Sequence, residues 1–83
     1  MAQLARSAAQ IGNTVKRGRR AAGLTQKELA DRLGLRQATV SSVEAGARGT
    51  KLSTLLDILG ALDLELTVAP RSGGATVALE DIF

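Results

Sequence analysis

The chain lacks the residue types on which most enzymatic chemistry depends. Its 83 residues include no cysteine and no histidine. Without these side chains, disulfides, the usual transition-metal sites and the usual nucleophile–base pairs cannot be built. The eight acidic residues are scattered along the sequence. We therefore expect a protein that is not an enzyme and that binds no metal ion, cofactor or small-molecule ligand.

Long apolar runs are also missing. The apolar stretches extend over only a few residues, whereas a membrane-spanning helix needs about 20. The opening segment, MAQLARSAAQ, is too short and too polar for a signal peptide. These features predict a protein without membrane contact. The absence of cysteine fits a reducing cytoplasm.

Charge is distributed unevenly. Residues 1–60 carry ten Lys/Arg and four Asp/Glu, a net charge of +6, whereas residues 61–83 carry one arginine and four acidic residues, a net charge of −3. The net positive charge of residues 1–60 favours a polyanion as partner, although basic residues also serve simply to solvate protein surfaces. The short length predicts one domain with a modest core, so dimerisation is an expected source of further burial.

Capping signals mark the first two of four predicted helices. In each, a hydroxyl residue is followed three positions later by Gln or Glu, which is the spacing of a capping box; the pairs are Ser7 with Gln10 and Thr25 with Glu28. Gly23 and Gly34 are placed to end these helices. A third helix is expected from about Arg36 to Ala45, with Gly46 after it.

The fourth predicted helix leads directly into a strand. Its leucines are expected in the core: Leu52, Leu55, Leu56, Leu59 and Leu62. After it, Leu64, Leu66 and Val68 alternate with polar or small residues up to Pro70, a pattern typical of a strand. A lone strand leaves its backbone groups unpaired, so we expect it to pair with the same strand of a second chain.

The second and third helices have the features of a helix-turn-helix unit. This unit joins two short helices by a turn that contains glycine, and the segment QKELADRLGLRQATVSSVEAG fits it. Ala30 is small where the helices cross, Gly34 supplies the positive φ of the turn, and Val40 fills the space between the helices. A helical hairpin without a nucleic-acid role is the alternative interpretation.

From about Ser7 to Leu64 the chain resembles the Cro/C1-type (xenobiotic-response-element, XRE) helix-turn-helix family. The matching residues are Arg19, Leu24-Thr25-Gln26, Glu28-Leu29-Ala30, Gly34, Gln37-Ala38-Thr39-Val40-Ser41, Glu44-Ala45-Gly46 and Leu55. The expected fold is mainly α: a four-helix, lambda-repressor-like domain over residues 7–63 and a strand over residues 64–70 that pairs across a homodimer. Residues 1–6 and 71–83 are expected to be flexible.

Within that family the chain is most similar to HipB-type antitoxins. The runs TQKELADRLGLRQATVSSVEAG and LSTLLDILGALDLELTVAPR carry this similarity. It implies a repressor that regulates its own operon and neutralises a HipA-like kinase toxin. In HipB-like proteins an aromatic residue at the end of the tail contacts the toxin, and Phe83 matches it by position. The alternatives are a stand-alone XRE-family regulator without a toxin and a protein-interaction module with an incidental basic face.

The predicted base contacts lie at the start of the third helix. A helix-turn-helix protein lays its second helix in the major groove, with the residues at the N-terminal end of that helix nearest the bases. The four residues at this end are Arg36, Gln37, Ala38 and Ser41. Arg36 can reach guanine O6 and N7, Gln37 can bond adenine N6 and N7, and Ala38 can touch a thymine methyl group. A merely solvated helix face is the alternative.

Further residues are predicted to position the protein on DNA. Phosphate contacts are expected from Gln26, Thr39, Arg48, Thr50 and Lys51, although Arg48 and Lys51 are equally compatible with a solvated basic loop. The family resemblance places Arg19 and Glu44 together as a partly buried, structural ion pair. A homodimer would read palindromic double-stranded operator DNA with half-sites about 34 Å apart. The predicted dimer contacts are Leu64, Leu66 and Val68, with an intrachain core as their alternative.

Overall fold

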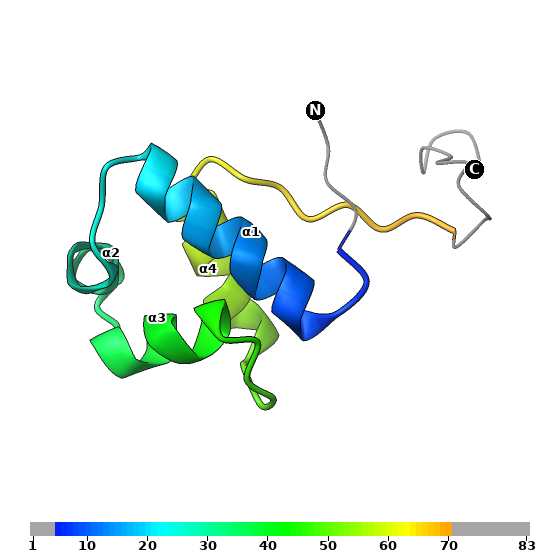
Figure 1. Ribbon diagram of the computed structural model, residues 1–83, viewed down its shortest axis with the longest axis horizontal. Coiled ribbons are helices and arrows are strands. Elements are labelled where there is room, and N and C mark those ends of the chain that lie inside the picture. The colour runs from blue at the N-terminus through cyan, green and yellow to red at the C-terminus, as the bar shows by residue number, and fades with distance from the viewer. Residues whose placement is uncertain (1–4, 71–83) are drawn as a thin grey trace.

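The computed structural model describes residues 5–70 of the chain. Within this range the fold consists of the helices α1 (Ala8–Ala21), α2 (Gln26–Leu33), α3 (Gln37–Glu44) and α4 (Leu52–Ala61). Helix α3 packs against both α1 and α2, and α4 packs against α2, as can be followed in Figure 1. The predicted mainly α, four-helix architecture is confirmed. No helix in the described part of the chain is long and apolar enough to cross a membrane.

The N-termini of α1 and α2 are capped by hydroxyl side chains. The Thr25 side chain accepts from the backbone N–H of Glu28 at 3.0 Å, and the Glu28 carboxylate accepts from the backbone N–H of Thr25 at 2.9 Å. This is the predicted capping box. At α1, Ser7 Oγ accepts from the backbone N–H of Gln10 at 3.2 Å, but the Gln10 side chain accepts from the backbone N–H of Arg6 instead. The first predicted box is therefore only half formed.

The turn of the helix-turn-helix unit depends on Gly34. This residue ends α2 with φ of +66°, a left-handed conformation that side chains other than glycine adopt only with strain. The backbone N–H of Leu35 then donates to the carbonyl oxygen of Ala30 at 2.9 Å. These features turn the chain sharply and set the angle at which α3 begins.

The core lies between the four helices. Its buried apolar residues are Val15, Leu24, Leu29, Ala30, Val40, Val43, Ile58 and Leu59. Ala30 and Val40 occupy the α2–α3 crossing and are 1% and 0% exposed, as their predicted packing roles require. The sequence pattern therefore located the centre of the helix-turn-helix unit correctly.

The inward face of α4 differs from the prediction. Leu52 and Leu56 were expected in the core, but they are 63% and 46% exposed, whereas Ile58 is fully buried. The stripe that faces the core is formed by Leu55, Ile58, Leu59 and Leu62. Both sets of residues have the i, i+3, i+4, i+7 spacing of one helix face, so spacing alone could not distinguish them.

Residues 64–70 follow α4 without forming a strand. A strand is defined by its pairing with a neighbour, and within residues 5–70 no such neighbour exists for this segment, so the predicted strand is not observed in a single chain. Leu64 packs partly against the core of its own chain, whereas Leu66 and Val68 are 47% and 65% exposed. The predicted tail over residues 71–83, including Phe83, lies outside the described residues, as do residues 1–4.

Candidate nucleic-acid interface

The start of α3 presents an exposed edge. Its four side chains are those predicted to contact bases, and all are exposed: Arg36, Gln37, Ala38 and Ser41. Arg36 is the N-cap residue, and its side chain makes no capping hydrogen bond to the helix. On the opposite side of α3, Val40 and Val43 are buried. The helix is therefore attached by one face and accessible along the other.

The far end of α3 is attached by a partly buried ion pair. Arg19 in α1 donates through Nε to Glu44 Oε2 at 2.6 Å and through Nη2 to Glu44 Oε1 at 3.0 Å. Arg19 Nη1 also donates to the carbonyl oxygen of Leu24 at 2.8 Å. The two side chains are only 9% and 4% exposed. The predicted pair of Arg19 and Glu44 thus joins α1 to the C-terminal end of α3.

The electrostatics of Glu44 follow from these contacts. Burial raises the pKa of its carboxyl group. The hydrogen bonds from Arg19 and Gln26, together with the charges of Arg19 and Lys16, outweigh this effect, so the pKa of Glu44 lies below its ordinary value. Conversely, the hydrogen bond to Glu44 raises the pKa of Arg19. Glu44 is therefore ionised at neutral pH and keeps its partner charged.

Gln26 joins this network, a role that no pattern in the sequence indicates. Its Nε2 donates to Glu44 Oε1 at 3.1 Å, from the first residue of α2 to the last residue of α3. The two residues are 18 positions apart, a separation at which no local pattern predicts a contact. This bond uses one of the two amide N–H groups, so the second amide N–H and the backbone N–H groups at the start of α2 remain as donors for an outside anion.

Gly12 was also missed by the sequence analysis. A Cβ atom at this position would lie 2.4 Å from the carbonyl oxygen of Val43 and 2.6 Å from that of Glu44. Only glycine allows α1 to approach the end of α3 this closely. Gly18, in contrast, would meet only the side chains of Leu64 and Leu62, at 3.1 Å and beyond. The position of α3 against α1 therefore depends on the backbone of Gly12.

The remaining predicted DNA contacts fall into two groups. Arg48, Thr50 and Lys51 are exposed in the loop between α3 and α4. Gln26 and Thr39 are only partly exposed. The structure thus places an exposed basic loop at one end of α3 and the exposed edge of α3 at the other.

Residues 15–68 match the family model described as Helix-turn-helix. The chain therefore belongs to the helix-turn-helix family of DNA-binding regulators. Within this family it is similar to the antitoxin HipB of Escherichia coli K12, with 35% identity over 74 residues that cover 89% of this chain and 84% of HipB. The HipB of E. coli O6:H1 (strain CFT073) is 36% identical over 74 residues, which cover 89% of this chain and 79% of that protein.

Solved structures show the same similarity to HipB. A HipA–HipB–O2–O3 complex and a HipB–O4 20mer complex each match with a TM-score of 0.77 and 37% identity, covering 86% of this chain and 100% of the matched chain. The restriction-modification controller protein C.AhdI of Aeromonas hydrophila matches with a TM-score of 0.64 and 36% identity over 70% of this chain and 88% of its own. The predicted membership of the XRE helix-turn-helix family and the similarity to HipB antitoxins are confirmed.

Proposed function

We propose that this protein is a sequence-specific transcriptional repressor that acts as the antitoxin of a HipBA-like module, regulating its own operon and neutralising a HipA-like kinase. The observation that carries the DNA-reading part is the exposed edge of α3, formed by Arg36, Gln37, Ala38 and Ser41 on a helix whose other face is buried. Similarity to HipB, which has been solved in a complex with HipA, supports the antitoxin part.

In this proposal α3 enters the major groove from its N-terminal end. Arg36 and Gln37 reach base edges, where their planar, multi-donor side chains discriminate guanine and adenine. Ala38 and Ser41 lie on the same edge and supply a methyl contact and a hydroxyl group. The far end of α3 is fixed to α1 by Glu44, so the edge keeps one orientation when it meets DNA.

Phosphate contacts come from the elements that flank α3. The exposed Arg48, Thr50 and Lys51 form one group, and the N-terminal backbone of α2 at Gln26, together with Thr39, forms the other. Such contacts set register and orientation but carry no sequence information directly. Their cationic members make binding strongly dependent on salt.

A second copy of the chain completes the site. Leu66 and Val68, which were predicted to form the interface, are exposed, as are Leu52 and Leu56 of α4. Pairing of residues 64–70 between two copies would satisfy their backbone groups and cover these apolar side chains. Leu64 contributes less because it already packs against its own core. The resulting two-fold dimer reads a palindromic operator.

Fluorescence anisotropy with a duplex from the region upstream of the gene tests the DNA-reading part. Gln37→Ala is expected to weaken binding about 5- to 150-fold, the equivalent of about 1–3 kcal/mol, because the substitution removes a bidentate hydrogen bond to a base. Arg48→Ala is expected to lower the slope of the log–log salt dependence by about 0.9 for each phosphate that is no longer neutralised. The control is Asn13→Ala, which removes an exposed amide from α1. Unchanged affinity for Gln37→Ala would remove this residue from the set of base contacts.

Co-purification from the native host tests the antitoxin part. Recovery of a kinase-like protein, together with lower kinase activity in the complex than in the free kinase, is the expected result. Recovery of operator DNA without such a partner would favour the alternative, a stand-alone XRE-family regulator. The similarity to the C.AhdI controller protein is compatible with that alternative, because C.AhdI has the same fold and belongs to a restriction-modification system.

A further inference from the structure

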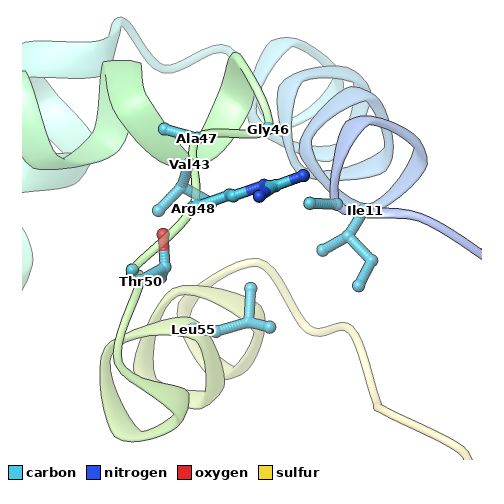
Figure 2. Close-up of a pocket in the computed structure, with 9 residues that line it drawn as sticks. Ile11, Val43, Gly46, Ala47, Arg48, Thr50 and Leu55 are labelled. Carbon is cyan, nitrogen blue, oxygen red and sulfur yellow. The ribbon is translucent and has the colours of Figure 1, made fainter.

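An apolar cleft of about 310 Å³ lies beside the loop that follows α3. Ile11 of α1, Val43 of α3 and Leu55 of α4 line it, so residues far apart in the sequence meet there. Figure 2 shows Arg48 extending from the loop across this cleft toward Ile11. Within residues 5–70 no carboxylate forms an ion pair with Arg48. The cleft therefore combines apolar walls with a cation that extends across it and has no carboxylate partner among residues 5–70.

We propose that the C-terminal segment of the same chain, residues 77–83, docks in this cleft. The segment reads VALEDIF, in which four large apolar residues surround two adjacent acidic ones. The apolar side chains, Phe83 among them, match the walls of the cleft, and burying them there removes apolar surface from water. Glu80 and Asp81 supply the negative charge that Arg48 lacks within the described residues.

The chain length and path allow this docking. Figure 1 shows residues 64–70 running along the long axis of the molecule toward the end at which α1 begins. The cleft is at that end, because Ala8 and Ile11 from the start of α1 line it. Docking of residues 77–83 leaves residues 71–76 as the connection from Pro70, and these six residues span up to about 20 Å when extended, about half of the longest dimension of the molecule, 39 Å. Because residues 64–70 already run toward the end of the molecule where the cleft lies, a connection of six residues suits this docking.

Docking has a consequence for DNA binding that rests on the proposed function. Arg48 is one of the residues proposed to contact a phosphate, and in the docked state the same guanidinium faces Glu80 and Asp81. The segment and the DNA backbone then compete for one cation. The acidic C-terminal segment thus lowers the affinity for duplex DNA. This effect is largest at low salt, where charge interactions are least screened.

Methyl NMR on the full-length chain tests the docking itself, without DNA. Phe83 is the only aromatic residue of the chain, so any ring-current shift of a methyl resonance reports the position of this one side chain. We expect upfield shifts for methyl groups of Ile11, Val43 and Leu55, and the disappearance of these shifts in Phe83→Leu, which keeps an apolar side chain. Leu33 at the end of α2, which does not line the cleft, is the internal control. Shifts at Leu52, Leu56 or Val68 instead, or none at all, would overturn the proposal.

Duplex binding tests the competition. Glu80→Gln combined with Asp81→Asn is expected to raise affinity at low salt about two- to five-fold, the size of an exposed ion-pair effect. The matched control is Asp57→Asn with Glu65→Gln, which changes net charge equally at two exposed positions that do not line the cleft. An equal gain in the control, or no gain in the tail variant, would overturn the competition. If the chain bound no duplex at all, the proposed function would fail while the NMR result still decided the docking.

Discussion

Removing the Glu44 carboxylate is expected to destabilise the protein severely. In Glu44→Ala the Arg19 guanidinium, with a side chain only 9% exposed, would still donate to the carbonyl oxygen of Leu24 but would have no carboxylate beside it. Breaking a buried pair by removing one partner costs about 3–5 kcal/mol, because a charge is left buried without compensation. A domain of this length has a total stability of about 4–12 kcal/mol. The variant should therefore lose about a quarter or more of its free energy of unfolding.

Urea unfolding followed by circular dichroism measures this loss. All variants are compared at one protomer concentration, because self-association adds to apparent stability. The matched control is Asp31→Ala, which breaks the Lys27–Asp31 ion pair. That pair has an N–O distance of 2.8 Å, but its side chains are 71% and 62% exposed, so little stability should be lost.

A double variant separates the cost of leaving one charge buried and unpaired from the contribution of the ion pair itself. Arg19→Met combined with Glu44→Leu replaces both charges by apolar groups and is expected to recover most of the stability that Glu44→Ala loses. A loss in Glu44→Ala no larger than that in Asp31→Ala would refute the role given to the buried pair. A double variant less stable than Glu44→Ala would also refute it, since the isolated charge would then not be the cause.

Other substitutions test the local packing and the acid response. Gly12→Ala should lose about 1–3 kcal/mol in thermal unfolding and bind DNA more weakly, because its Cβ would displace α1 from Val43. Gly60→Ala is the control, since a Cβ there would meet nothing within 4 Å beyond its chain neighbours and its own helix backbone, and a gain of about 0.4–1 kcal/mol is expected. Thr25→Ala should lose about 1 kcal/mol with the N-cap of α2, again measured by thermal unfolding. The pKa of Glu44 is lowered in the folded state, so the free energy of unfolding should be maintained above pH 4.5, the ordinary pKa, and should fall as the pH drops below that value. In Glu44→Gln, the free energy of unfolding should decline less steeply with falling pH.

The features predicted correctly from the residues are mostly local. Thr25 with Glu28 marks a helix start through groups three residues apart, and Gly34 marks a helix end through its own backbone conformation. Ala30 was recognisable because a helix-turn-helix crossing demands a small residue. The Arg19–Glu44 pair was different: the family resemblance predicted it, and the structure confirmed it.

The features missed depend on contacts across the fold. Gln26 meets Glu44 only because α2 and α3 cross, and Gly12 is required only because α1 lies against the end of α3. On α4, two leucine stripes satisfied the same helical spacing, and packing selected the one that includes Ile58. The strand predicted over residues 64–70 is not observed; a strand needs a neighbouring backbone, and the described residues of one chain offer none to this segment. The assignments of individual DNA contacts stay predictions.

The attachment of α3 by one face and by its last residue has an evolutionary consequence. Substitutions at positions 36, 37, 38 and 41 change exposed side chains, whereas Val40, Val43 and Glu44 hold the helix in place. Under the proposed function, recognition and folding are therefore encoded by separate residues of α3 and its N-cap, Arg36. Under that function, duplicated copies of such a gene can diverge in their target sequences while keeping the same interior, so that related regulators can coexist in one cell without binding one another's operators.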